Sequence, residues 1–203
     1  MGLAYRLAKA GHDCIIGSRS LDKATAAVDE LREKDGALPL FSATNGDAAR
    51  DAEAVIVTTP YAALGGTIPA IADSLAGKLT ISTVVPMSFD GGQASLLMPR
   101  AGSAAQELHE LAPGARVAAA FQNLSAKKLL SGRTVDADVI TCADDEEAKQ
   151  QVIALANEIE GVRGIDGGAL ANAQIVEAIT VLLVSVNRNY KARAGVRITG
   201  IKL

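Results

Sequence analysis

Residues 53–60 read EAVIVTTP, and this stretch is the strongest strand signal in the chain. Upstream of it, helical spacing over 3–10 precedes a short buried strand at 14–16 and a helix that we expect to run from a Ser20 N-cap to about residue 34. Strands that alternate with helices of roughly ten to fifteen residues indicate βαβ units. The sequence therefore predicts an α/β fold: a Rossmann-like, doubly wound, mostly parallel sheet.

The other expected elements continue this alternation. In chain order they are a weak strand near 38–41, a short helix capped by Asn45, a helix near 68–75, a strand at 79–83, a helix at 104–111, a strand at 116–121, a short helix at 126–130, a strand at 138–142, a helix at 146–159, a strand at 162–165 and a long apolar helix from 170 to about 193. The best candidate boundary is Gly167-Gly168, which divides the chain into 1–166 and a small C-terminal extension, 167–203, that ends in the long helix and its tail.

The start of the pattern departs from a complete doubly wound domain, which opens with a strand, a glycine-rich turn and a helix. This sequence begins in the helix, and in the usual order the first strand lies between the strands at 14–16 and 54–58. Each buried backbone group left unpaired costs ~1–3 kcal/mol against a total stability of ~5–15 kcal/mol. We therefore expect a gap in the sheet and roughly fourteen missing residues that carry a GxGxxG-type loop.

Composition excludes several classes of function. The chain has 203 residues, 20 Lys and Arg against 23 Asp and Glu, 3% aromatic residues and no Trp, so it has neither the charge nor the stacking side chains of a nucleic-acid-binding protein. Two distant cysteines predict neither a metal site nor a disulfide framework and favour a reducing cytoplasm. The strongly apolar run 181–184 is far shorter than the ~20 residues that span a bilayer, so no membrane partner is expected.

The segment Gly17-Ser18-Arg19 ends the strand that, in dinucleotide-binding domains, contacts the adenosine ribose. An NAD site has Asp or Glu there, and that carboxylate would repel a 2′-phosphate. Here Ser18 can donate a hydrogen bond, Arg19 supplies a forked cation, and Lys23 follows one helical turn later. This pattern predicts NADP; the alternative is a helix N-cap followed by two solvated cations.

Three further strand ends carry candidate cofactor contacts, because ligands of open α/β sheets bind at the carboxyl ends of the strands. Tyr61 follows the strongest strand and can pack against the cofactor, or it can be an amphipathic surface residue. Val84 and Pro86 follow the next strand and can line the nicotinamide pocket, although valines are more often plain core. Gln122 can bind a carboxamide or substrate ring, or it can only cap the helix that follows.

The long C-terminal helix carries polar residues among apolar ones, and buried polar groups need partners. Asn172, Gln174, Glu177 and Thr180 are expected to face a ligand or a subunit interface. No Ser-His-Asp, Cys-His or paired-carboxylate arrangement stands out, so no catalytic acid or base is assigned. That absence suits hydride transfer between two bound rings, which needs positioning more than proton transfer.

Five segments together resemble one family. They are GLAYRLAKAGHDCIIGSRSLDKA at 2–24, VIVTTPY at 55–61, AAAFQNLSA at 118–126, DGGALANAQIVEAIT at 166–180 and NRNYKARAGVRITGIKL at 187–203. In order and spacing they resemble the NADPH-dependent F420 reductases (F420:NADP oxidoreductases) over nearly the whole chain. The resemblance implies hydride exchange between NADP(H) and the deazaflavin coenzyme F420 in a cytoplasmic homodimer. It also implies an opening strand and a GGTGxxG loop before the first helix.

The resemblance places Ser18, Arg19 and Lys23 at the 2′-phosphate and Tyr61 at the cofactor. It implies further cofactor contacts at Gly65 and Ala126, and positions near the deazaflavin at Leu124 and Thr180, with residues 167–203 forming the deazaflavin pocket and a dimer interface. Three residues depart from the archaeal pattern near that pocket: Gln122 stands for a His, Gln174 for an Arg and Ala178 for a Ser. These departures bear on the deazaflavin side, so a related flavin is an alternative acceptor.

Two other functions stay open from the residues. An NADP-dependent imine or pyrroline-carboxylate type reductase shares such a nucleotide domain, but it needs an all-helical C-terminal dimerisation domain, whereas strands recur here at 138–142 and 162–165. A non-catalytic NADP-binding redox sensor, or an inactive fragment, is favoured by the missing glycine loop, whose N–H groups would hold the pyrophosphate.

Overall fold

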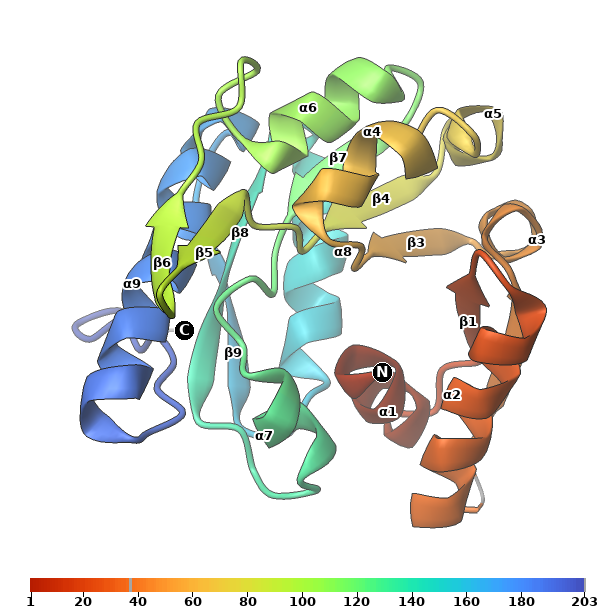
Figure 1. The fold of residues 1–203 in the computed structure, drawn as a ribbon, viewed down its shortest axis with the longest axis horizontal. Coiled ribbons are helices and arrows are strands. Elements are labelled where there is room, and N and C mark those ends of the chain that lie inside the picture. The colour runs from red at the N-terminus through yellow and green to blue at the C-terminus, as the bar shows by residue number, and fades with distance from the viewer. Residues whose placement is uncertain (37, 203) are drawn as a thin grey trace.

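The computed structural model describes residues 1–36 and 38–202 and confirms an α/β fold with a mostly parallel sheet (Figure 1). Its elements, in chain order, are α1 (Gly2–Lys9), β1 (Cys14–Ser18), α2 (Leu21–Lys34), β2 (Leu40–Thr44), α3 (Asn45–Asp51), β3 (Ala54–Val57), the 3-10 turn η1 (Tyr61–Ala63), α4 (Leu64–Thr67), α5 (Ala72–Leu75), β4 (Leu79–Ser82), β5 (Met87–Asp90), β6 (Gln93–Leu96), α6 (Ala104–Leu111), β7 (Arg116–Ala119), α7 (Ala126–Leu130), β8 (Ala137–Ala143), α8 (Glu146–Asn157), β9 (Val162–Asp166), the 3-10 turn η2 (Leu170–Asn172) and α9 (Ala173–Tyr190).

The larger sheet has the order β3-β4-β7-β8-β9. Its neighbours pair in parallel except β7 and β8, which run antiparallel with Ala119 opposite Cys142. One apolar cluster joins this sheet to α6 and α9, and a second joins it to α1, α7 and α8. The sheet is thus covered on both faces, as short strands of almost continuous apolar residues require.

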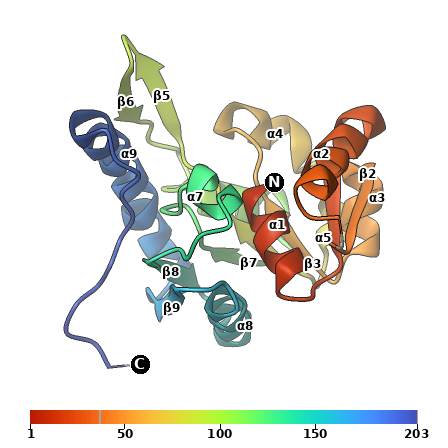
Figure 2. The same cartoon turned by 90° about the horizontal axis from the view of Figure 1, so that it is seen from below.

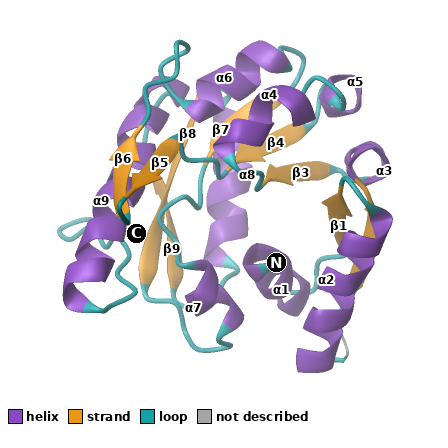
Figure 3. Ribbon diagram, in the orientation of Figure 1, coloured by secondary structure: helices purple, strands orange, loops and turns teal. Residues whose placement is uncertain are grey.

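The predicted gap in the sheet is present. Among the residues that the structure describes, β1 pairs only with β2, in a separate parallel sheet that starts with Cys14 opposite Leu40, and it does not pair with β3. A cleft of about 1040 Å³ lies between the two sheets, lined on one side by Cys14–Ile16 and on the other by Val55–Val57. Figure 3 shows β1 and β3 standing apart with α1 beside the opening.

The β5–β6 hairpin was not predicted; no element was expected between residues 83 and 104. Its turn is Gly91-Gly92, with φ of +53° and +80°, and two consecutive residues in this region are the mark of a tight hairpin turn. The flanking strands are mostly exposed and only four residues long, so their alternation is weak. The glycine pair was the available signal.

Several local predictions were wrong in detail. The cap of α3 is Thr44, whose hydroxyl accepts from the Asp47 amide, and not Asn45. Ser20 does occupy the N-cap of α2, as predicted, although its side chain accepts no hydrogen bond from that helix. Of the helix expected near 68–75, only the short α5 forms, while η1 and α4 precede that range.

The long C-terminal helix begins as the turn η2 and ends at Tyr190, slightly before the predicted end, because Lys191 adopts a left-handed conformation with φ of +50°. By length and composition alone, Leu170–Tyr190 could cross a membrane, with a mean hydropathy of 1.5 and 22% of its apolar window buried. The short run 181–184 lies inside this helix, so its length underestimates the apolar segment. Figure 2 shows α9 at one side of the molecule, with the C-terminal tail leading away from it.

Candidate functional site

The carboxyl ends of β3, β4 and β7 meet at one edge of the larger sheet, because the three strands are parallel neighbours. The loops that follow them contribute Thr59, Thr83 and Gln122 to the lining of the cleft, together with Leu124 and Ala126. This is the position at which open α/β sheets bind their ligands. The cleft therefore runs from the gap beside β1 to the edge where the sequence predicted the cofactor.

The backbone conformation of Phe121 sets the direction of the loop after β7. This buried residue has a φ of +70°, a left-handed conformation that is uncommon for a bulky side chain. Strain of this kind costs of order 1–3 kcal/mol and collects at functional sites. Here it turns the chain so that Gln122 and Asn123, both buried, follow directly at the sheet edge.

Gln122 has one bonded and one free end. Its Nε2 donates to the Ser82 carbonyl at 3.2 Å, whereas its Oε1 is buried and has no hydrogen-bond partner among the described residues. Thr59 also lines the cleft, and its Oγ1 is likewise buried without a hydrogen-bond partner in the described chain. Because unpaired buried polar atoms are costly, these two oxygens suit a ligand that donates hydrogen bonds, such as the carboxamide of a nicotinamide.

A hydrogen-bond network ties α9 to this loop. Asn123 Nδ2 donates to Thr180 Oγ1 at 2.9 Å and to the Val176 carbonyl at 3.0 Å. Thr180 Oγ1 in turn donates to the Gln122 carbonyl at 3.0 Å. The fold thus brings Thr180 next to Gln122, although they are far apart in the sequence, and both belong to the predicted site.

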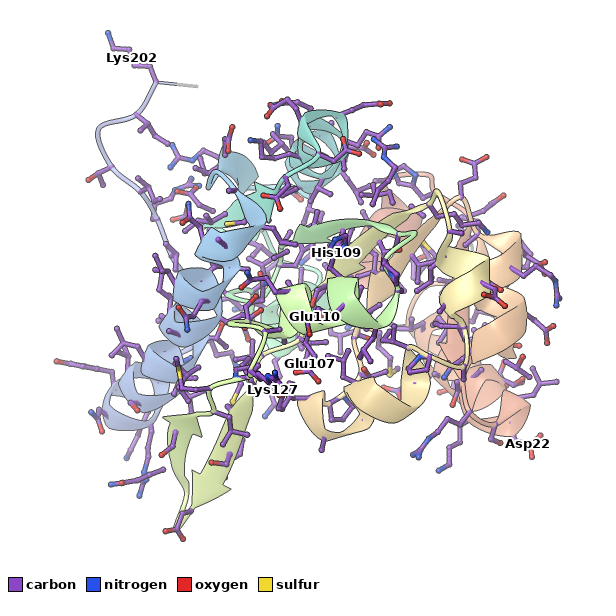
Figure 4. The ribbon with its side chains drawn as sticks, turned by 90° about the horizontal axis from the view of Figure 1, so that it is seen from above. Asp22, Glu107, His109, Glu110, Lys127 and Lys202 are labelled. Carbon is purple, nitrogen blue, oxygen red and sulfur yellow. The ribbon has the colours of Figure 1, made fainter. Side chains whose placement is uncertain are left out.

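The three residues predicted for the 2′-phosphate lie at the end of β1 and the start of α2. Ser18 is half-buried, and Arg19 and Lys23 are exposed; within the described chain neither cation forms an ion pair. Neighbouring Gly17 lines the cleft. Asp22, in the same helical turn, points outward at the edge of the molecule in Figure 4. The two cations are therefore available to an anion at this mouth of the cleft.

The remaining predicted residues do not line the cleft. Tyr61 donates its hydroxyl to Glu107 Oε2 at 2.8 Å, and burial together with this bond raises the pKa of the phenol to about 12. Figure 4 shows Glu107 on α6, on the side facing α4. Gly65 is exposed on α4, while Val84 and Pro86 are buried beyond β4. Gln174, on the first turn of α9, contacts Met98 through Nε2 and Sδ at 4.0 Å.

Glu177 has a role that the sequence did not reveal. Its side chain is fully buried, and its two carboxylate oxygens accept from the Ala104 and Ala105 amides at 3.0 and 3.1 Å, at the start of α6. Burial raises its pKa to about 7, although the two amide bonds act in the opposite direction. Ligand or interface was expected for this polar helix position, and instead Glu177 joins α9 to the N-terminus of α6. Only the packing of α6 against α9 identifies this partner.

Comparison with known proteins gives the family. The profile of the family "NADP oxidoreductase coenzyme F420-dependent" matches residues 1–86. The F420-dependent NADP reductase of Methanocaldococcus jannaschii is 39% identical over an alignment that covers 100% of this chain and 94% of that protein. The chain belongs to this family. The resemblance inferred from the five sequence segments is thereby confirmed.

Solved structures agree with the fold of an F420-dependent NADP reductase. A protein from Arthrobacter sp. FB24, described as a candidate F420-dependent NADP reductase, superposes with a TM-score of 0.84 at 24% identity, covering 98% of this chain and 94% of that one. An imine reductase from Myxococcus stipitatus in complex with NADP+ superposes with a TM-score of 0.64 at 12% identity, covering 94% of this chain and 59% of that one. At these identities the likeness establishes the fold alone.

Proposed function

We propose that the chain transfers a hydride between NADP(H) and coenzyme F420, with NADP along the cleft and the deazaflavin between the Gln122 loop and α9. Membership of the F420-dependent NADP reductase family makes it an oxidoreductase with these two coenzymes. The observation that carries the proposed geometry is the cleft at the carboxyl edge. Within residues 1–36 and 38–202, the two cations at one mouth form no ion pair and Gln122 Oε1 at the other end has no hydrogen-bond partner. The imine-reductase alternative has only fold-level support.

The chain's own residues position the two coenzymes. Arg19 and Lys23, with the Ser18 hydroxyl, contact the 2′-phosphate of NADP, and Ala126 follows the loop over the cofactor. Gln122 Oε1 accepts from the carboxamide. Val84, Pro86, Tyr61 and Gly65 stay predicted contacts, although they do not line the cleft. When bound, the coenzymes supply the hydride donor and acceptor carbons, and the protein orients the rings and excludes water.

Residues 167–203 complete the deazaflavin side in this proposal. Thr180 is fixed by Asn123 and Gln122, which places one face of α9 beside the end of the cleft, with Leu124 in the loop opposite. Gln174 and Ala178 each lie next to a buried position of the same helix, and in this proposal their departure from the archaeal pattern alters the pocket wall. A related flavin is the alternative acceptor that the activity assay distinguishes.

The gap between β1 and β3 bears on pyrophosphate binding. Both strands present an unpaired edge to the cleft, and their apolar side chains line it. We propose that a strand which pairs in parallel with both edges, followed by a glycine-rich loop, joins the two sheets and completes the NADP site. Backbone N–H groups of such a loop bind pyrophosphate at the start of a helix.

The decisive experiment follows the visible absorbance of F420 after NADPH is added. Two proteins are compared: the chain of 203 residues, and the same chain extended with a strand and a GGTGxxG loop before Met1. We expect NADPH-dependent loss of absorbance, with the larger rate in the extended protein. If both bind NADPH but neither reduces F420, then hydride transfer to F420 is refuted, and riboflavin and FMN are tested as acceptors. Binding without turnover of any acceptor would indicate the redox-sensor alternative.

We also propose that the protein is a cytoplasmic homodimer in which α9 packs against a second copy. Ile175 and Leu182 are each 62% exposed and lie seven residues apart, on one helix face. The buried Glu177 and the contacts with β6 and α6 occupy other sides of α9, so the helix presents a single apolar face and not an apolar surface all round. A self-complementary patch of this kind suits a two-fold interface better than lipid.

Replacing Leu182 with Asp tests this interface. We expect the unaltered protein to scatter light as a particle of twice 20.8 kDa, and Leu182→Asp to scatter as a single chain, because the substitution buries a charge in the interface. Leu21→Asp, at a residue 50% exposed on α2, is the matched control and should leave the dimer intact. A monomeric unaltered protein, or one found in the membrane fraction, would contradict the proposal.

A further inference from the structure

A second pocket lies apart from the cleft, between the β5–β6 hairpin and α9. It has a volume of about 460 Å³. The hairpin contributes Gly92, Gln93 and Ala94, and α9 contributes Val184, Ser185, Arg188 and Asn189. Most of these side chains are polar, so the pocket suits a hydrated or charged group and not an apolar ring.

Arg188 supplies the only formal charge among the lining residues. Its Nη1 donates to the Gly92 carbonyl at 3.0 Å, which fixes the guanidinium beside the hairpin turn. Asp90 lies two residues before Gly92 in the sequence. Within residues 1–36 and 38–202, however, neither Asp90 nor any other carboxylate forms an ion pair with Arg188. A guanidinium has five N–H donors, so most of its hydrogen-bonding capacity is open. The pocket is therefore positively charged and fits an anion.

The position of this charge relative to the proposed deazaflavin site follows from helix geometry. Thr180, Val184 and Arg188 are spaced four residues apart and lie along one side of α9. A rise of 1.5 Å per residue places Arg188 roughly 12 Å along the helix from Thr180. A ribityl chain that ends in a phosphodiester spans a comparable length. A deazaflavin ring near Thr180 thus has its anionic side chain within reach of Arg188.

The charge of the following segment is consistent with this arrangement. Residues 188–203 carry five basic and no acidic side chains in a protein whose net charge is -3. Arg197 is committed to Asp136 and Asp138, whereas Lys191, at the end of α9, forms no ion pair within the described residues. Arg188 and Lys191 therefore provide two cations at this end of the helix.

We propose that the pocket between the β5–β6 hairpin and α9 binds the anionic side chain of the deazaflavin coenzyme, with Arg188 contacting its phosphodiester and Lys191 its outer carboxylates. This rests on the proposed function and extends it, because it divides substrate recognition into a ring site and an anion site. Arg188 determines affinity for the full coenzyme and does not take part in hydride transfer. Charge-assisted hydrogen bonds to phosphate give such a site both affinity and specificity.

The test compares F420 with the deazaflavin riboside that lacks the phosphodiester and carboxylates. For each, the Kd is measured from deazaflavin fluorescence and the KM and kcat from NADPH oxidation. In Arg188→Gln we expect Kd and KM for F420 to rise about tenfold, while kcat, the KM for NADPH and both constants for the riboside stay unchanged. Arg50→Gln, on α3 at the opposite side of the molecule (Figure 1), is the matched control and should change nothing.

Ionic strength provides an independent readout. The Kd for F420 should rise with added salt in the unaltered protein and less so in Arg188→Gln, whereas the Kd for the riboside should be nearly independent of salt. Equal affinity of the unaltered protein for F420 and riboside, or an equal effect of Arg188→Gln on both, would overturn the anion site and leave the proposed function standing. Failure to reduce either deazaflavin would overturn the proposed function and the anion site together.

Discussion

Replacing Arg19 with Asp should lower kcat/KM for NADPH at least about 100-fold and erase or reverse the preference for NADPH over NADH. A hydrogen bond between a guanidinium and a phosphate contributes about 1.5–3 kcal/mol. The variant loses that bond and places a carboxylate where it repels the 2′-phosphate, while the same carboxylate can accept from the 2′-hydroxyl of NADH. Because Arg19 is exposed and forms no ion pair in the described chain, its removal should not disturb the fold.

The measurement is the ratio of kcat/KM values for the two nucleotides, with F420 as acceptor. Lys202→Asp makes the same change in net charge at the far end of the C-terminal tail (Figure 4), so it separates a local effect from a general one. Its ratio should equal that of the unaltered protein. An unchanged ratio in Arg19→Asp would remove Ser18, Arg19 and Lys23 from the proposed 2′-phosphate site.

Replacing Arg6 with Met should lower the free energy of unfolding by about 3 kcal/mol or more. Arg6 is 6% exposed, and its guanidinium donates to the carbonyls of Leu129, Lys128 and Arg133 at the end of α7. The bond from Nε to the Leu129 carbonyl measures 2.7 Å. Each buried carbonyl left without a donor costs about 1–3 kcal/mol. The substitution also removes the favourable interaction between the positive charge and the negative end of the α7 dipole.

Urea unfolding, followed by circular dichroism, gives this free energy. Lys9→Met is the matched control, since Lys9 lies on the same helix but is largely exposed, and its contact with Asp35 is 3.6 Å. That substitution should cost less than about 1 kcal/mol. A loss of similarly small size in Arg6→Met would mean that water replaces Arg6 at the three carbonyls, and that α1 and α7 are held by apolar packing alone.

The strand ends were predictable where one local pattern sufficed. Strand-to-loop transitions placed Arg19, Tyr61 and Gln122 at strand ends from the sequence, and the gap beside the strand at 14–16 followed from the usual strand order. The free end of Gln122 was not predictable. It depends on whether Ser82, forty residues earlier, takes the amide nitrogen and leaves the oxygen without a partner.

The hairpin and the pocket beside it illustrate the same limit. Gly91-Gly92 marks a turn, but the short exposed strands around it acquire their role only because β6 packs on α9. In the sequence, Arg188 is one of several basic residues near the C-terminus. Its contact with the Gly92 carbonyl joins residues 96 positions apart and distinguishes it from the others.

The sequence by itself determined the alternation of strands and helices, the break in the sheet and the family, because these depend on periodicity and on motifs within a few residues. Tertiary structure alone decided the partners of the charged side chains. Arg6 and Glu177 look like ordinary helix residues, yet both are buried and bonded to backbone groups of other elements. The physical reason is that burial and hydrogen-bond partners are set by which elements meet in space, and a buried charge is stable only where the fold supplies those partners.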